Sequence, residues 1–160
     1  MNRSGIRSAL FVVMAVGSAT AGADPELSGY WSCPATMQLA AVGQNQLTLK
    51  LDTRSHLRSE GRYESEGDAI VQLGMWPLPL SATSHGSWAR EQDRVTVTVE
   101  SLELSPGSTS GVELQRYMIQ QLRTLFPVFP HTQVAQILVE TSTQLVLEDA
   151  FGEQYTCTRL

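Results

Sequence analysis

Three histidines, His56, His85 and His131, are the side chains best suited to acid–base chemistry or metal binding in this 160-residue chain. They are widely separated and form neither an H-x-H nor an H-x-x-x-H pair, and no cysteine or group of acids lies beside them. Zinc sites combine several such ligands at short, characteristic spacings. The histidines therefore indicate no metal site, and we expect them at the surface or in loops.

Motifs for nucleophilic catalysis and phosphate binding are also missing. Ser84-His85-Gly86-Ser87 lacks the G-x-S-x-G elbow that presents a catalytic serine, so a serine triad would have to assemble from distant positions. Glu64, Glu66 and Asp68 flank Gly67 in a pattern that matches a solvated turn and not a calcium loop. No glycine-rich phosphate loop occurs. We expect no enzyme, no catalytic or metal-binding residue and no cofactor.

Aromatic side chains offer binding chemistry instead. Trp76, Trp88, Tyr63 and Tyr117 are spread along the chain and can either line an apolar cavity or fill a core. Eight-stranded barrels do one or the other. We predict these four residues as ligand contacts.

The cysteines Cys33 and Cys157 lie near the two ends of the chain. In an oxidising compartment two cysteines most simply form one bridge, the alternative being two free thiols. A bridge across so long a loop stabilises by about 4–5 kcal/mol in the chain-entropy account. It also requires the first and last elements to be neighbours.

Residues 1–23 match a secretory signal peptide. Arg3 and Arg7 form a positive region, residues 9–16 are apolar, and Ala21-Gly22-Ala23 is an A-x-A cleavage signature before Asp24. The apolar run is far shorter than the roughly 20 residues of a membrane span, and a buried N-terminal helix is the alternative. We expect a protein of the bacterial periplasm, although a eukaryotic secretory origin stays open.

Residues 24–160 have the size of one domain, and no membrane-length apolar run follows the leader. Residues 1–23 hold two arginines and no acidic residue, which leaves 9 basic against 16 acidic side chains and a formal charge of −7. Nucleic acids and anionic lipids require clustered positive charge. We therefore expect neither as a partner.

Most of the remaining sequence indicates short strands, because apolar residues alternate with polar ones. The alternation in residues 95–104 changes phase, which predicts a β-bulge near Glu100-Ser101. Pro77 and Pro79 predict a break, and residues 65–68 and 150–153 predict turns. The other predicted strands are 29–33, 46–52, 56–64 with a bend at Gly61, 69–75, 84–90, 136–140, 144–149 and 154–159.

An amphipathic helix is predicted over residues 112–126. Ser110 and Glu113 match a capping box, and Pro127 ends the pattern. Its stripe either packs on the sheet or serves as a lid or a docking face. The stripe consists of Leu114, Tyr117, Met118, Leu122, Leu125 and Phe126.

If the terminal strands pair antiparallel with Cys33 opposite Cys157, then Trp31 lies opposite Arg159 on the same face. A guanidinium over an indole contributes about 0.5–2 kcal/mol. We predict a structural role for this pair.

Gly29-Tyr30-Trp31 resembles the G-x-W motif that opens lipocalin-like (calycin) barrels, in which the tryptophan packs against an arginine from the end of the barrel. Arg62-Tyr63-Glu64, Gly86-Ser87-Trp88 and Leu147-Glu148-Asp149 are similar to segments of small periplasmic proteins of this kind. A lipocalin helix follows the eighth strand, whereas the helix here precedes the last three strands. The resemblance implies a divergent, mainly β protein: one antiparallel barrel of about seven or eight strands with an inserted helix.

The function expected from these features is non-enzymatic binding of a small apolar or amphipathic ligand inside the barrel, with an Arg or Tyr fixing its polar end. The alternative is a protein-interaction module, such as an accessory factor, chaperone or inhibitor of another exported protein. That module would use the helix face or a sheet edge.

Overall fold

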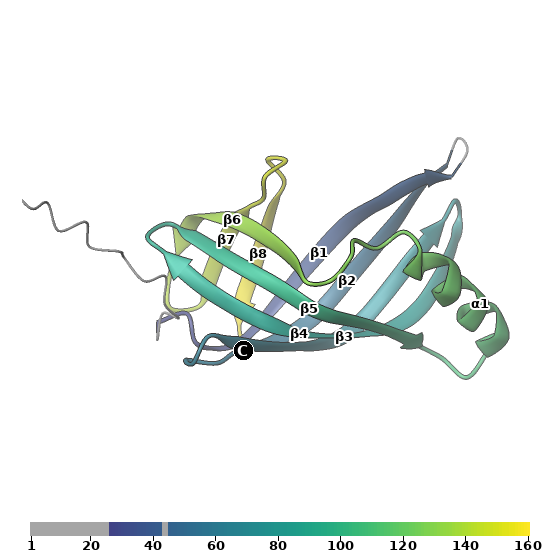
Figure 1. Ribbon diagram of the computed structural model, residues 1–160, viewed down its shortest axis with the longest axis horizontal. Helices are drawn as coiled ribbons and strands as arrows, with labels where there is room; N and C mark the ends of the chain where they lie inside the picture. The colour runs from purple at the N-terminus through teal and green to yellow at the C-terminus, as the bar shows by residue number, and fades with distance from the viewer. Residues whose placement is uncertain (1–25, 43–44) are drawn as a thin grey trace, which may run out of the picture.

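The computed structural model describes residues 26–42 and 45–160, and the predicted leader, residues 1–23, lies outside them. Within the described residues the chain forms eight strands and one helix (Figure 1). The elements are β1 (Gly29–Val42), β2 (Asn45–Leu57), β3 (Arg62–Leu73), β4 (Trp76–Glu91), β5 (Arg94–Pro106), α1 (Val112–Arg123), β6 (His131–Glu140), β7 (Gln144–Glu148) and β8 (Gln154–Arg159).

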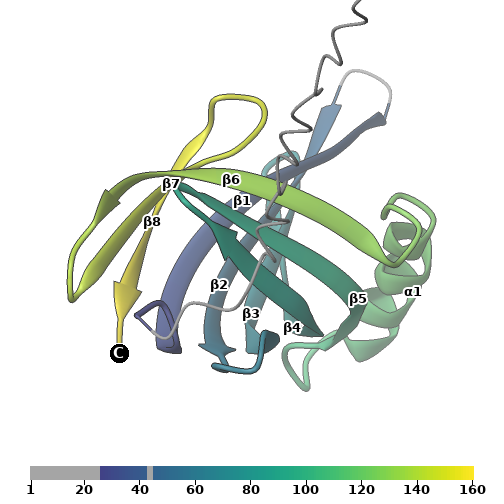
Figure 2. The same cartoon turned by 60° about the vertical axis from the view of Figure 1, so that its left-hand side comes forward.

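The strands form a closed antiparallel barrel in which each strand pairs with its neighbours in the chain, and β8 returns to β1. This confirms the predicted fold class, and an eight-stranded barrel with one helix fits a lipocalin-like barrel. The first five strands are long, whereas β6, β7 and β8 are shorter and complete the barrel at one end (Figures 1 and 2). We call this the closed end.

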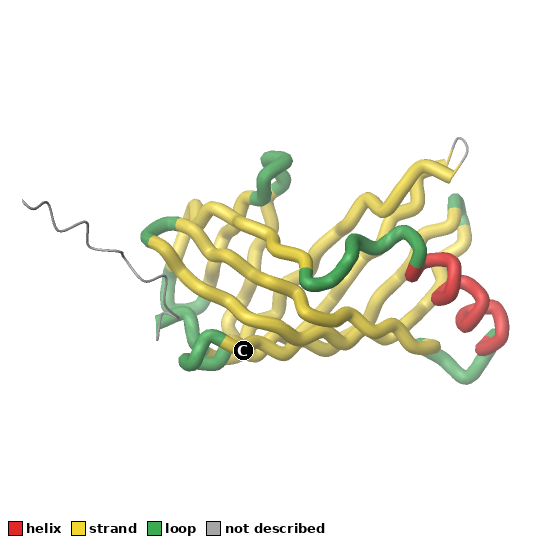
Figure 3. The backbone as a smooth tube through the Cα atoms, in the orientation of Figure 1, coloured by secondary structure: helices red, strands yellow, loops and turns green. Residues whose placement is uncertain are grey.

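The helix α1 lies at the other end, which we call the helix end (Figure 3). It packs against β4 and β5. Because β6 pairs only with the first half of β5, from Arg94 to Val99, the second half of β5 has β4 as its single strand neighbour among the described residues. The helix covers the inner face there.

The barrel contains two separate apolar clusters. The first cluster lies at the helix end and includes Ile119 and Leu122 of α1. Its other buried members are Leu49, Ala69, Val71, Leu78, Leu80, Ala82 and Leu104. The second cluster lies at the closed end and consists of Leu27, Trp31, Tyr63, Trp88, Val95, Ala135, Leu145, Leu147 and Cys157.

The phase change in β5 is a bulge at the predicted position. Ser101 lies opposite His85 and Val99 lies opposite Gly86, so Glu100 is the extra residue. The bulge keeps Val95, Leu102 and Leu104 directed into the barrel, which confirms the prediction.

Two predictions about turns near β3 differ from the structure, whereas a third turn farther along the chain agrees with it. The turn at residues 65–68 is wrong: these residues lie inside β3, and Gly67 pairs with Thr53 and Ala82 of the adjacent strands. The predicted bend at Gly61 is instead a full reversal between β2 and β3, closed by a hydrogen bond from the Arg58 N–H to the Arg62 carbonyl (2.8 Å). The predicted turn between β7 and β8 is confirmed, with the Asp149 carboxylate accepting the N–H groups of Phe151 and Glu153.

The predicted break at Pro77 and Pro79 is also wrong, because both lie in β4 opposite Gln72 and Ile70 of β3. Pairing of β4 with β5 begins only at Leu80. The start of β4 is therefore an edge, and a proline needs no ladder donor on its open side.

The helix differs from the prediction at both ends. It begins after Gly111, which has a φ of 69° and no side-chain cap, so the Ser110–Glu113 capping box does not form. It ends at Arg123, and Leu125 and Phe126 pack against the first cluster from the segment that follows. Across the described residues, no helix has the length and apolar character to cross a membrane.

Gln115 explains why the buried face of the helix agrees only in part with the predicted stripe, of which Met118, Leu122, Leu125 and Phe126 do pack against the first cluster. Its side chain is 1% exposed, accepts the Gly107 N–H (2.8 Å), and donates to the Ser110 carbonyl (2.7 Å). These bonds turn Gln115 inward together with Ile119 and Leu122. Leu114 and Tyr117, which the apolar stripe included, are consequently exposed.

Candidate functional site

The junction of β1 and β8 closes the barrel through a short ladder and a disulfide. Only Trp31 with Arg159 and Ser32 with Thr158 form register pairs there. The next residues, Cys33 and Cys157, form the predicted disulfide with their Cα atoms 4.2 Å apart. The disulfide therefore extends the shortest strand pairing of the described barrel.

Trp31 and Arg159 form the expected contact at the closed end. The Arg159 guanidinium carbon lies 4.3 Å from the centre of the Trp31 ring. Arg159 also donates to the main-chain carbonyls of Ser28 and Glu26, and the Trp31 indole N–H donates to the Leu27 carbonyl (2.8 Å). The polar atoms of this pair thus hold the segment that enters β1.

A band of small residues separates the two apolar clusters on the inner face. Cross-strand register places Ser55 opposite both Trp31 and Ser65, and Ser65 opposite Ser84, so the three serines share the face of buried Trp31. Thr53 and Gly67 form the adjacent row. We call these five residues the waist, and all five are partly buried.

The close approach of neighbouring strands limits the size of the side chains at the waist. A Cβ on Gly67 would collide with the Asp52 carbonyl oxygen of β2, and a Cβ on Gly86 would collide with the Thr98 carbonyl oxygen of β5. Both positions therefore require glycine for close strand approach. Small residues occupy the inner face here, where the clusters on each side carry leucines and tryptophans.

The hydroxyl groups of the waist interact with one another and with Tyr63. Ser55 donates to Ser65 (3.1 Å), and Ser84 hydrogen-bonds to the Tyr63 phenol. Burial raises the pKa of Tyr63 above 10.0, against a smaller opposite effect of the Ser84 hydrogen bond. The two clusters and the waist hold no charged side chain, and Gln115 is the single buried polar residue that the structure describes.

The predicted ligand contacts do not come together at one place. Trp88 and Tyr63 are buried in the second cluster, and the Trp88 indole N–H already donates to the Arg58 carbonyl (2.9 Å). Tyr117 is 57% exposed on α1. Trp76 begins β4 at the helix end, and its side chain lies outside the described residues.

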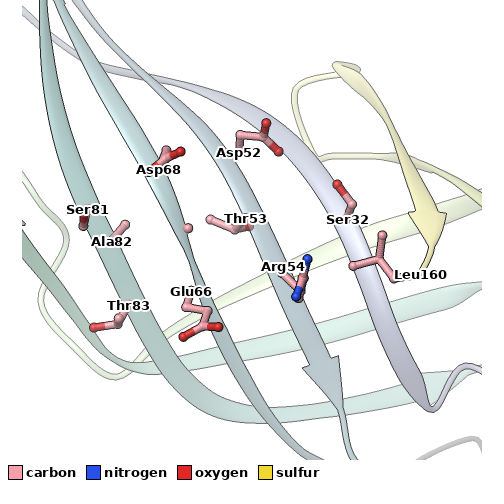
Figure 4. A pocket seen from close by; sticks show the side chains of 11 residues that line it. Ser32, Asp52, Thr53, Arg54, Glu66, Asp68, Ser81, Ala82, Thr83 and Leu160 are labelled. Atoms are coloured by element: carbon pink, nitrogen blue, oxygen red, sulfur yellow. The ribbon is translucent and has the colours of Figure 1, made fainter. Parts of the chain in front are cut away.

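The outer face of β1–β4 carries a shallow polar groove that the sequence did not indicate (Figure 4). It consists of two hollows of about 510 and 520 Å³ that share Arg54, Glu66 and Thr83. Asp52 and Asp68 face each other across β2 and β3 at one end. At the other end the rings of Tyr30 and His56 stack with centroids 4.1 Å apart.

His85 and Ser101 also line this groove, with Nδ1 of His85 2.8 Å from the Ser101 hydroxyl. Glu64 is the carboxylate opposite His85 in the register, but both of its oxygens accept hydrogen bonds from Arg58 (3.0 Å each). Within the part of the chain that the structure describes, the hydrogen bonds of the His85 imidazole include the Ser101 hydroxyl and no carboxylate of the kind that orients the histidine of a catalytic triad. Among the described residues, no three His, Cys, Asp or Glu side chains gather as metal ligands.

The waist was missed because its serines look like ordinary polar strand or turn residues. A signal was nevertheless present, since the alternation Leu47, Leu49, Leu51 continues in the same phase to Thr53 and Ser55. Small hydroxyl residues that continue an apolar period indicate an inner face with smaller side chains.

Comparison with protein-family models and with curated protein sequences finds no match to this chain.

Proposed function

We propose that the protein is a non-enzymatic binding protein that holds a small, mainly apolar ligand inside its barrel at the waist. The observation that carries the proposal is the band of small, partly buried hydroxyl residues between two apolar clusters. Ligand sites combine a mainly apolar lining with a few polar groups that fix orientation. The clusters would bury the two apolar ends of the ligand, and the waist would meet its polar centre.

The chemistry of the waist favours an uncharged ligand. Serine and threonine hydroxyls both donate and accept hydrogen bonds, so they suit a hydroxyl, carbonyl or ester group. A charge placed there would be desolvated without a counter-ion, which is costly. An Arg or Tyr was expected to fix the polar end of the ligand, but Arg159 contacts Trp31 and donates to two carbonyls at the closed end, in the structural role predicted for it. Ser84, Ser65 and Tyr63 take that role in this proposal.

A divergent member of the lipocalin-like barrels, exported to the periplasm by residues 1–23, is the wider setting that we propose. The G-x-W motif at Gly29-Tyr30-Trp31 and the contact of Trp31 with Arg159 support the family. The disulfide supports an oxidising compartment.

The first test is binding of N-phenyl-1-naphthylamine, an uncharged apolar fluorophore, to the purified protein. We expect saturable binding to the wild type and to Ser84→Ala, which keeps the space. Ser84→Leu fills the waist and is expected to weaken binding at least about tenfold, the effect of losing roughly 1.4 kcal/mol.

Thr83→Leu is the matched control, because Thr83 is the neighbouring residue on the exposed outer face of β4. Thermal unfolding and circular dichroism establish that each variant is folded. Equal affinity of the wild type and a folded Ser84→Leu, or a wild type that does not bind, would refute binding at the waist. If binding at the waist is supported, native mass spectrometry of the protein from its own source would identify the ligand class.

A further inference from the structure

The strand β1 has one edge that no described strand covers. It pairs with β2 from Gly29 to Val42, but with β8 only at Trp31 and Ser32. Beyond Cys33, β8 pairs with β7 alone. Figures 1 and 2 show β1 running on toward the helix end while β8 stays at the closed end. Residues 34–42 therefore form an open edge, which we call the β1 edge.

The direction of the main-chain groups follows from one hydrogen bond. The Leu160 N–H donates to the Tyr30 carbonyl (2.9 Å), so the Tyr30 main chain points toward the β8 side. Main-chain groups alternate in direction along a strand, so those of Pro34 and Thr36 point to the same side. Pro34 supplies a carbonyl there, and Thr36 supplies both a carbonyl and an N–H group.

No other described element occupies this edge. The helix α1 packs against β4 and β5 and has no close backbone approach to β1. The described main-chain hydrogen bonds outside the ladders include none to residues 34–42. Unpaired N–H and C=O groups on a strand edge form a template for another strand.

The β1 edge also lacks the charged side chains that commonly protect an edge against pairing. Natural edge strands commonly carry charged side chains, whereas Gly29–Val42 contains no charged residue. Pro34 and a bulge between Gln38 and Ala40 modify the edge without closing it. An uncharged, open edge favours addition of a strand.

We propose that the β1 edge binds an extended segment of a partner polypeptide as an added strand. Such a strand would turn alternate side chains toward the inner face beside the first cluster and the others outward. On the outer face, the adjacent strand β2 carries exposed Lys50 opposite Thr36 and exposed Asp52 opposite Pro34, so charged outward side chains on the added strand are complementary to this face. The partner is therefore an amphipathic segment, which the uncharged β1 of a second copy does not provide.

The test uses a labelled, end-blocked peptide with the sequence of residues 46–53, QLTLKLDT, which has the required alternation. Fluorescence anisotropy is expected to show saturable binding to the wild-type protein. A peptide with four consecutive methylated main-chain nitrogens is expected not to bind, because it cannot form the ladder. Thr36→Pro removes the outward N–H and is expected to weaken binding by about tenfold.

Thr36→Val is the matched control, since it keeps the N–H and the strand propensity. The methylated peptide tests the proposal on the wild-type protein even if Thr36→Pro fails to fold. Absence of binding to the wild type, equal binding of the methylated peptide, or full affinity of folded Thr36→Pro would overturn the proposal. Sedimentation that shows a wild-type dimer, lost in Thr36→Pro, would also overturn it by making a second copy the occupant.

Discussion

Tyr63 lies where the waist meets the second cluster, with its ring only 6% exposed. A tyrosine buried in this way resists ionisation, because the charged phenolate loses its hydration. The neutral form is therefore favoured in the folded state, in agreement with the raised pKa. The ionisation of Tyr63 therefore makes the stability of the folded barrel depend on pH in the alkaline range.

The folded pKa of Tyr63 is raised above its unfolded value, so its stabilising effect is present below pH 10 and is lost as pH rises through the folded pKa. We expect the free energy of unfolding to fall as the pH rises above about 10, by up to about 1.4 kcal/mol per pH unit for one group. Tyr63→Phe should remove part of this slope in urea unfolding.

Tyr117→Phe, at an exposed position of α1, provides the control for the substitution itself. Burial also raises the pKa of Tyr155, so Tyr155→Phe should act in the same direction as Tyr63→Phe. If the free energy of unfolding of Tyr63→Phe depended on pH as steeply as that of the wild type, Tyr63 would ionise as easily in the folded state as in the unfolded state.

At the scale of elements, Gln115 attaches the helix to the loop that follows β5. Gln115→Met keeps the length of the side chain but leaves the Gly107 N–H and the Ser110 carbonyl without this partner. We expect a loss of about 2 kcal/mol in the free energy of unfolding, because at least two side-chain hydrogen bonds of about 1 kcal/mol each are lost. Gln120→Met, at an exposed position of the same helix, should change stability little. Equal effects of the two substitutions would contradict the anchoring role.

Elements were predictable where the information is local. The alternation of β2 and the phase change at Glu100 follow from side-chain direction, which depends only on the strand period. The prolines of β4 were misjudged because their tolerance depends on where β5 begins to pair, which is a tertiary fact. The segment from Ser65 to Asp68 has the composition of a turn. It lies in a strand because Gly67 pairs with Thr53 of β2 on one side and Ala82 of β4 on the other.

The candidate site was less predictable than the fold. The cysteine pairing and the Trp31–Arg159 contact follow from one antiparallel register. The waist depends on the register between three strands, which aligns their inward-facing small residues. The pattern within each strand does not reveal that register. Aromatic content directed attention to Trp88, whose indole is engaged by the turn between β2 and β3.

At the scale of the whole molecule, the disulfide joins residues 124 positions apart at the weakest strand pairing. Cys33→Ser with Cys157→Ser should lower the free energy of unfolding by about 4–5 kcal/mol in the chain-entropy account. Urea unfolding of the oxidised wild type and of this double variant measures the difference. The reduced wild type is the control and should match the variant. A variant as stable as the oxidised protein would show that the ladder alone closes the barrel.

The order of the strands around the barrel, which is also their order in the chain, has a consequence for synthesis. Every ladder from β1–β2 to β7–β8 joins strands that are consecutive in the chain, so each pair can form as soon as its second strand is free to fold. The closing pair is different, because Cys33 and its partner Cys157 are 124 positions apart in the sequence. Ring closure therefore requires all eight described strands, and until it occurs the Cys33 thiol remains available to any oxidant it meets.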